Sequence, residues 1–238
     1  MEDKLSVVVC SRETAEQKDS FIKHIKETCG CNTHVFFLIN QEGVGLTTIY
    51  GDMLKSDKVD TNIIVFIHDD IEFLKKGWGA EILRLFNEHK DYGIIGVAGS
   101  KEFDENGAWW QYKKIVGQVL HRSNGKSWLT KFSPLLDKDL EEVCVIDGLF
   151  MAVDKERITK GFDTDFSGFN HYDTSLCLSN YIDGKTKIGV TTNIRIAHNS
   201  IGEMKPEWYT NRDKLNEKFG DYYPIDVEKD ERTKRFKS

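Results

Sequence analysis

Residues 63–70, Ile63-Ile64-Val65-Phe66-Ile67-His68-Asp69-Asp70, join a short apolar run to two adjacent carboxylates. The run is mostly β-branched and predicts a strand buried on both faces, Ile63–Ile67. Carboxylates desolvated at a strand end are costly without a cation, and hard oxygen ligands suit Mg²⁺ or Mn²⁺ bound together with phosphate oxygens. Asp69 and Asp70 can also open a turn or cap a helix. The dipeptide alone leaves both interpretations open.

Strand and helix patterns alternate on both sides of this segment. Strands are predicted at residues 5–10, 35–39, 63–67 and 94–98, and helices at residues 15–28, 46–55 and 78–89. This alternation implies right-handed crossovers and a mostly parallel sheet covered on both faces, so we expect an α/β fold with a Rossmann-like sheet flanked by helices. A ligand site should then lie at the carboxyl ends of the strands, at Ser11-Arg12, Asn40 and residues 68–70.

The second half of the chain is less regular. Residues 101–140 have weak periodicity, which indicates long loops and a hairpin. Residues 143–153 are predicted to form two short strands broken at Asp147-Gly148. A helix is predicted at residues 172–181, a strand at 188–197 and a final helix at 207–219. We expect one domain over residues 1–225 and a flexible tail at 226–238.

Composition excludes several classes of protein. The 238 residues carry 33 Lys and Arg against 39 Asp and Glu, a net charge of -6 with the signs interspersed. This balance argues against nucleic acid or an anionic membrane surface as the main partner. Apolar runs stay far below the roughly 20 residues of a membrane-spanning helix, and the first residues lack signal-peptide features. Five cysteines, an odd number, argue against a disulfide framework. A soluble, cytoplasmic protein is expected, with oligomeric state unknown.

Two further polar residues follow or begin predicted elements. His198 comes directly after the run 194–197, at a strand end, where imidazole could bind an Mn²⁺-like ion or could simply be solvated. Asp173 lies in the first turn of the helix predicted at 172–181. It could complement the helix dipole, which would lower its pKa, or act as a general base toward an acceptor hydroxyl.

Three other features are ambiguous. Trp109-Trp110 could stack on a sugar at a cleft mouth or fill the core. Gly43 and Gly45, before the second helix, could let backbone amides approach a nucleotide, although the spacing is a weak signal. Cys29-Gly30-Cys31, with His24 upstream, lacks the second ligand pair of a structural zinc site, so we interpret it as a helix-to-strand turn.

The order of these motifs resembles that of the GT-A-fold glycosyltransferases, and it is similar to the inverting family 2 enzymes. Within that group it most resembles a small bacterial glycosyltransferase-like family related to the streptomycin-biosynthesis-type domain. The resemblance runs from about Leu5 to Gly202 and implies a nucleotide-sugar-binding half at residues 1–100 and an acceptor and catalytic half at 101–225.

Particular positions carry the resemblance in the donor half. Ser11 and Arg12 resemble the family's nucleotide-binding turn, and Asn40 to Gly43 resemble the turn after its second strand. Residues 66–70 resemble the acidic metal-binding motif, with His68 where an Asp often stands. The resemblance then implies Asp70 as a metal ligand and Asp69 as a contact to the ribose or the donor sugar.

Three segments of the acceptor half also match. Residues 147–152, with Asp147 and Gly148, resemble the strand pair beside the donor sugar and the acceptor. Residues 166–173 resemble the segment of the catalytic base, usually Glu-Asp, with Tyr172 in place of the Glu, so that Asp173 is the implied base. His198 matches a late histidine that completes metal coordination in many relatives.

The activity implied by this resemblance is metal-dependent, inverting hexosyl transfer. The donor would be a nucleoside-diphosphate sugar, with UDP the first expectation, and the cofactor Mn²⁺ or Mg²⁺. The acceptor would be a saccharide, a small molecule or a lipid-linked hydroxyl compound, which would allow peripheral association with a membrane. A nucleotide-sugar-binding homologue without activity and a scaffold protein remain alternatives. A sugar nucleotidyltransferase is disfavoured because residues 11–14 contain no glycine-rich loop.

Overall fold

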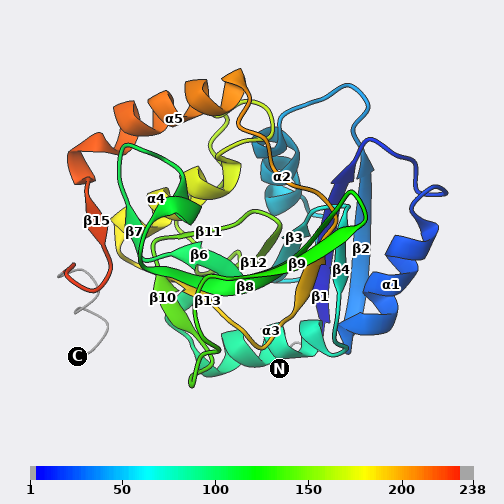
Figure 1. Cartoon of the computed structure of the whole chain (residues 1–238). Helices are drawn as coiled ribbons and strands as arrows, with labels where there is room; N and C mark the ends of the chain where they lie inside the picture. The colour runs from blue at the N-terminus through cyan, green and yellow to red at the C-terminus, as the bar shows by residue number, and fades with distance from the viewer. Residues whose placement is uncertain (1–3, 231–238) are drawn as a thin grey trace.

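A seven-stranded sheet forms the centre of the computed structural model, which describes residues 4–230 (Figure 1). Its strand order is β10-β13-β5-β12-β3-β1-β2. In that order the strands span Glu141–Val143, Lys187–Val190, Tyr92–Gly96, Phe150–Asp154, Ile63–Ile67, Lys4–Ser11 and Asn32–Ile39. Three neighbouring pairs are parallel and three are antiparallel. The fold is α/β, as expected, but the sheet is mixed and less parallel than predicted.

The mixed character of the sheet comes in large part from β12. This strand enters between β3 and β5 and runs antiparallel to both. The alternation of strands and helices in the first half of the chain cannot predict the direction of β12, which belongs to the second half. Because of its direction, β12 begins at the edge where β3 ends, and the backbone N–H of His68 donates to the carbonyl of Leu149 at 3.1 Å.

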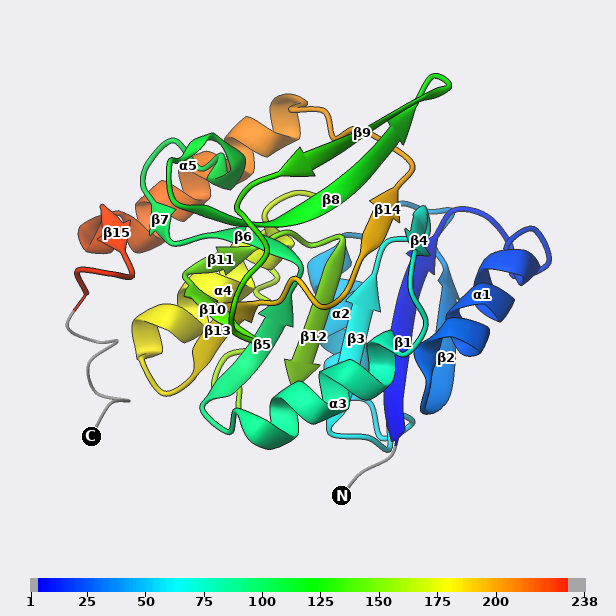
Figure 2. The same ribbon diagram turned by 60° about the horizontal axis from the view of Figure 1, so that its bottom comes forward.

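The described residues form five α-helices. They are α1 (Asp19–Cys29), α2 (Leu46–Lys55), α3 (Trp78–Glu88), α4 (Tyr172–Asp183) and α5 (Pro206–Phe219). Helix α3 crosses one face of the sheet and packs against α1, whereas α2 and α4 lie on the opposite face (Figure 2). The predicted bounds of α2 and β3 are confirmed. Between residues 4 and 230, every helix is too short or too polar to span a bilayer.

A second sheet lies beside the carboxyl edge of the first. Its order is β11-β6-β8-β14-β4, and β9 pairs with β8. These strands span Val145–Ile146, Ala98–Ser100, Ile115–Ser123, Ile196–His198, Ile71–Phe73 and, for β9, Lys126–Lys131. The predicted strand at 188–197 is therefore divided between the two sheets, as β13 and β14. In the turn between these two strands, the backbone N–H of Asn193 donates a hydrogen bond to Thr191 Oγ1.

The expected hairpin is the pair β8 and β9, which extends away from the rest of the molecule (Figure 2). Asn124 and Gly125 connect the two strands, and both have positive φ angles, 51° and 71°. A two-residue turn with positive φ at both positions matches the right-handed twist of hairpin strands and is most often Asn-Gly. This dipeptide could have located the hairpin from the sequence.

The end of the described chain packs on the domain. Strand β15 (Ile225–Asp226) pairs with β7 (Glu102–Phe103), and Val227 is buried. Lys114 Nζ lies 2.8 Å from Asp226 Oδ2. A flexible tail was expected from residue 226, but residues 226–230 pack against the domain, and residues 231–238 lie outside the described residues.

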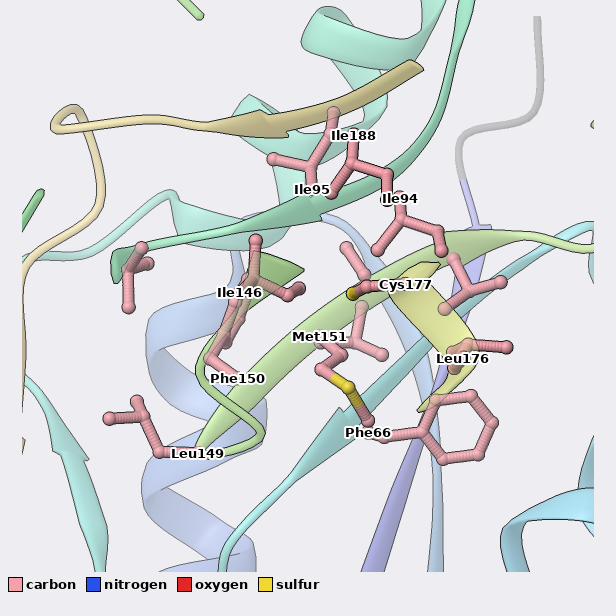
Figure 3. Close-up of a cluster of buried hydrophobic side chains, with 14 of the residues drawn as sticks. Phe66, Ile94, Ile95, Ile146, Leu149, Phe150, Met151, Leu176, Cys177 and Ile188 are labelled. Atoms are coloured by element: carbon pink, nitrogen blue, oxygen red, sulfur yellow. The ribbon is translucent and has the colours of Figure 1, made fainter. Parts of the chain in front are cut away.

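The hydrophobic core connects the central sheet to α4 (Figure 3). Its labelled members come from β3, β5, β11, β12, the turn before β12, β13 and α4, and they include Phe66, Ile95, Phe150, Leu176 and Cys177. All five are buried. This packing holds the first turn of α4 against the edge where β3 ends and β12 begins. The polar residues of these three segments therefore face one another.

Candidate functional site

A cleft of about 470 Å³ opens at the carboxyl ends of β1 and β3. Residues from the first strand, the loop after it, α2 and the segment after β3 line it, together with Phe169. They include Ser11, Arg12, Lys18, Asn40, Tyr50, His68, Asp69 and Asp70. The predicted location of the site at this edge therefore coincides with a real cavity. Four of the five residues predicted to contact a nucleotide line it.

Three side chains at the cleft could hold a metal ion. Ligand atoms of His68, Asp70 and His198 all lie within 4.8 Å of one another. Strand β14 brings His198 to this place by pairing with β4, so that His198 is opposite Ile71, and the N–H of Asn199 donates to the carbonyl of Asp70 at 2.9 Å. One carboxylate and two imidazoles are suitable ligands for Mn²⁺. Asp70 and His198 were predicted as ligands from the sequence, and His68 was not.

Electrostatic coupling sets the protonation states of these three side chains. His198 Nε2 lies 3.3 Å from Asp70 Oδ1. Burial alone would raise the pKa of Asp70, but the hydrogen bond and charge of His198 outweigh it and lower the pKa. Burial and the nearby His198 lower the pKa of His68. Asp70 is thus held as a carboxylate and His68 as a neutral imidazole, the forms that coordinate metals. Burial alone would lower the pKa of His198, but the hydrogen bond to Asp70 and the charge of Asp70 outweigh it and raise the pKa, so a bound cation would have to displace a proton from this imidazole.

Asp69 takes part in a separate network from Asp70. Ser11 Oγ donates a hydrogen bond to Asp69 Oδ2. Lys18 Nζ donates to the carbonyl of Asp69 at 3.0 Å and also lies 3.0 Å from Glu13 Oε2. The neighbouring carboxylates outweigh burial and raise the pKa of Lys18, so its positive charge is maintained at the cleft. Lys18 was not predicted as a site residue, because it precedes α1 in a polar segment with no distinguishing pattern.

Asp173 is anchored at the start of α4 by two backbone groups. Its Oδ2 accepts from the N–H of Gly148 at 2.8 Å, and its Oδ1 accepts from the N–H of Thr174 at 2.7 Å. Burial raises the pKa of Asp173 and the charge of Asp147 raises it further, to about 6, although these hydrogen bonds act in the opposite direction. The helix N-terminus was expected to lower this pKa. The N–H of Thr174 does act in that direction, but burial and like charge outweigh it, so the expected net lowering is wrong.

Tyr172 and Gly148 bring the metal group and Asp173 together. The buried Tyr172 hydroxyl lies 2.8 Å from His68 Nε2. A Cβ atom at Gly148 would lie 2.2 Å from the Tyr172 hydroxyl and 3.0 Å from Asp173 Oδ2. Only glycine therefore allows the turn before β12 to approach α4 this closely. Tyr172 and Gly148, predicted as sugar or acceptor contacts, support the residues beside them.

His121 and Ser200 contact His198, and neither was predicted as a site residue. Strand pairing places His121 of β8 opposite His198, with the ring centroids 6.0 Å apart. Ser200 Oγ lies 3.2 Å from His198 Nε2. Trp128 of β9 stacks on His121 at 5.6 Å between ring centroids. Because β8 and β14 are joined only in the folded sheet, no local sequence signal indicates this neighbourhood.

The turn after β2 is arranged by Asn40 and by two glycines. The Asn40 side chain bonds both the N–H and the carbonyl of Val44, each at 2.8 Å. Gly43 lies on an exposed turn and does not line the cleft, so the structure does not support it as a nucleotide contact. Gly45, the residue before α2, packs closely against Gly168, because a Cβ atom at Gly45 would lie 2.8 Å from the backbone nitrogen of Gly168.

Arg12 and Phe169 face each other in the lining of the cleft. The Arg12 guanidinium carbon lies 5.5 Å from the centroid of the Phe169 ring. A guanidinium and an aromatic ring at this distance attract each other through the ring quadrupole. Both side chains can stack on a planar base or a sugar.

The two adjacent tryptophans have different environments. Trp109 is buried, with its ring centroid 5.3 Å from that of Phe132, so it belongs to the core. Trp110 is 38% exposed and contacts Trp208 of α5 at 6.2 Å between centroids. Neither lines the cleft described above, so the expectation of a direct role at that cleft is unsupported for both. Trp110 remains a candidate for acceptor contact.

Comparison with known proteins supports the assignment of the fold. The model of the Glycosyltransferase like family matches residues 6–219. Two solved structures share the fold over most of this chain. GalNAc-T7 with UDP, GalNAc and Mn²⁺ has a TM-score of 0.53 at 11% identity, covering 92% of this chain and 49% of that one. The catalytic domain of Drosophila β1,4-galactosyltransferase 7 with xylobiose has a TM-score of 0.50 at 12% identity, covering 89% and 80%.

This chain spans about half the length of the GalNAc-T7 chain. No curated protein matches the sequence. The match of the family model covers far more than half of the residues, and both structures are glycosyltransferases of the GT-A fold. The chain therefore belongs to the glycosyltransferase-like family, and its fold is the GT-A fold of the family 2 type.

Proposed function

We propose that this protein is a metal-dependent, inverting glycosyltransferase that moves a sugar from a UDP-sugar to a hydroxyl acceptor. Membership of the family supports glycosyl transfer. The fold shared with GalNAc-T7, whose structure contains UDP and Mn²⁺, supports the choice of donor and cation. The observation that carries the proposal is the convergence of His68, Asp70 and His198 at the edge of the cleft.

The donor atoms in this group fit a divalent cation such as Mn²⁺. Asp70 supplies a carboxylate with a lowered pKa, and His68 and His198 supply imidazole nitrogens. Tyr172 holds the ring of His68 through its hydroxyl, which is the kind of support that orients metal-binding histidines. When bound, the cation would neutralise the charge that develops on the leaving diphosphate.

The rest of the cleft would hold the donor. Ser11, Arg12 and Asn40 line the part nearest β1, where the nucleoside would bind, and Arg12 with Phe169 offers flat surfaces for stacking. Lys18 adds a positive charge beside Asp69, suited to a phosphate oxygen. The hydroxyl of Ser11 holds the carboxylate of Asp69, which would accept hydrogen bonds from the ribose or the donor sugar.

Asp173 would act as the general base. It would take the proton of the acceptor hydroxyl while that oxygen attacks the anomeric carbon on the face opposite the diphosphate. A single displacement of this kind inverts the configuration at the anomeric carbon and forms no covalent enzyme intermediate. A pKa of about 6 suits this role, because the group is ionised at neutral pH and is more basic than an ordinary aspartate.

Thermal unfolding with UDP and Mn²⁺, added separately and together, tests the donor site. A ligand at about 100 times its dissociation constant stabilises the folded state by roughly 2.7 kcal/mol. For a domain of this size the midpoint should rise by roughly 2–4 °C per kcal/mol. We expect a rise of several degrees that requires both UDP and Mn²⁺ and that Asp70→Asn abolishes.

Asp139→Asn is the matched control. Asp139 belongs to a second group of possible metal ligands with Glu88 and His89. Arg84 Nη2 lies 2.9 Å from Asp139 Oδ1, and the positive charge of this arginine disfavours the binding of a cation. This variant should keep the full rise. If neither UDP, GDP nor dTDP with Mn²⁺ raises the midpoint of the parent protein, the proposed donor site is wrong. Binding without transfer to any acceptor would instead identify an inactive homologue.

A further inference from the structure

Cys29 and Cys31 form a close pair of thiols outside the cleft. Their Sγ atoms are 3.4 Å apart, which is longer than a disulfide bond. The intervening Gly30 has a φ angle of 81°, which turns the chain sharply between α1 and β2. The pair lies just before the first residue of β2, whereas the cleft lies at the opposite, carboxyl end of the sheet.

Neighbouring glycines make room for the two sulfur atoms. A Cβ atom at Gly79 of α3 would lie 2.2 Å from Cys29 Sγ and 3.1 Å from Cys31 Sγ. A Cβ atom at Gly30 would lie 2.8 Å from the Cα of Gly77. Helix α3 therefore presents bare backbone to the thiol pair, and the sulfur atoms meet in the space that side chains would otherwise fill.

One of the two thiols is accessible from outside. Cys29 is fully buried, whereas Cys31 is partly exposed and lines a groove of about 870 Å³ with Gly30, Ala80 and Leu83. The other described cysteines differ from this pair. Cys144 and Cys177 are buried, and Cys10 lies in the cleft.

We propose that Cys29 and Cys31 are a reactive dithiol that low-molecular-weight disulfides oxidise to an intramolecular disulfide. The Cys31 thiolate attacks the small disulfide, forms a mixed disulfide and releases one small thiol. Cys29 then loses its proton and attacks the sulfur of Cys31, which releases the second small thiol. The two cysteines lose two electrons and two protons in total, and the small disulfide is reduced to two thiols.

The order of attack follows from the environment of the pair. The interaction with Cys31, followed by burial, raises the pKa of Cys29 well above its ordinary value. Cys29 therefore keeps its proton while Cys31 reacts first at the groove. Thr33 Oγ1 donates to Cys29 Sγ at 2.7 Å, so the second sulfur is held next to the first. Trivalent arsenicals, which bind two thiols at once, should recognise the same geometry.

The full chain should be equilibrated with mixtures of oxidised and reduced glutathione, and free thiols then blocked with a maleimide. Intact mass and peptide mapping give the outcome. We expect a loss of two hydrogen atoms, no maleimide on Cys29 or Cys31, and full reversal by reduced glutathione. Cys29→Ser should accumulate glutathione on Cys31, and Cys31→Ser should show neither modification. Cys10→Ser should behave as the parent protein does.

Phenylarsine oxide provides a second readout that does not depend on oxidation. One equivalent should bind the parent chain and resist dilution, whereas Cys31→Ser should not retain it. The proposal is overturned if the parent protein carries glutathione on Cys31 without an internal disulfide, or if phenylarsine oxide does not bind. Even if Cys29→Ser does not fold, peptide mapping of the parent protein shows whether Cys29 and Cys31 form an internal disulfide. The result is independent of the proposed transferase activity, since no step uses the cleft.

Discussion

His68 and Tyr172, 104 positions apart in the chain, are joined by a hydrogen bond of 2.8 Å between the imidazole Nε2 and the phenol hydroxyl. These are the two residues at which the chain departs from the motifs that its sequence otherwise resembles. Because the two departures contact each other, they form one structural unit. The unit links the end of β3, where the metal group lies, to the start of α4, which carries Asp173.

Tyr172→Phe removes only the hydroxyl of this pair. The folded state should lose about 1 kcal/mol, the usual net value of such a hydrogen bond, and Mn²⁺ affinity should fall about 10- to 100-fold because His68 is no longer oriented. Urea unfolding and a manganese titration measure the two effects. Tyr223→Phe is the matched control, since the buried Tyr223 hydroxyl has no hydrogen-bond partner in the described structure. Equal Mn²⁺ affinity in the two variants would contradict the orienting role.

Asp173→Asn should remove the general base and leave the donor site intact. We expect turnover to fall by about 10²- to 10⁴-fold, the usual contribution of a positioned base, while UDP affinity with Mn²⁺ changes less than about twofold. Steady-state kinetics and calorimetric titration provide the two numbers. Near-full transfer by the purified variant would show that another residue accepts the proton.

The pKa of Asp173, raised to about 6, should appear in the dependence of rate on pH. The base works only as a carboxylate, so kcat should decrease as pH falls through about 6. An ordinary aspartate, with its pKa near 4, would keep kcat constant to a lower pH. A pH-rate profile over about pH 4.5 to 8 checks this. A profile without an acidic limb above about pH 5 would exclude Asp173 as the titrating base.

The same group should affect stability in a predictable direction. The pKa of Asp173 in the folded state lies above its unfolded value of 3.8. Asp173 therefore makes its full favourable contribution to the free energy of unfolding below about pH 4, and this contribution is lost as pH rises through about 6. The difference in unfolding free energy between the parent protein and Asp173→Asn should therefore decrease by about 1–3 kcal/mol over this interval. Denaturant unfolding at several pH values measures it. A constant difference would mean that Asp173 is not desolvated.

Gly148→Ala should damage both stability and activity. The new Cβ atom would lie 2.2 Å from the Tyr172 hydroxyl, and such overpacking usually costs about 1–3 kcal/mol. Displacement of Tyr172 and Asp173 should also lower kcat. Gly220→Ala is the matched control because a Cβ atom there meets nothing within 4 Å. If both variants unfold at the same denaturant concentration, the close approach of the turn before β12 to α4 is not required for stability.

The local chemistry of the sequence was sufficient to predict much of this fold. A run of five apolar residues buries itself on both faces of a sheet, so β3 could be predicted with its exact bounds, and the helical spacing of residues 46–55 did the same for α2. The polar residues after β1 and β3 pointed to the edge where the cleft opens. Periodicity carries this information because it depends only on which side of an element is buried.

Predictions failed where one element had to be placed against another. The strand at 188–197 divides between two sheets, β12 enters antiparallel, and residues 226–230 pack on the domain. Gly43 stays outside the cleft. A strand pattern reports burial but not the direction or identity of the neighbouring strand. These properties depend on packing across the whole sheet.

The sequence by itself determined the α/β class, most of the element positions and the candidate residues Asp70, Asp173 and His198. Only the tertiary structure decided that His68 joins Asp70 and His198, that His121 lies beside them, and that the pKa of Asp173 rises rather than falls. The physical reason is that residue type and local spacing set the propensity and chemistry of each segment. Distances between side chains and the loss of water around them arise when segments remote in the chain pack together.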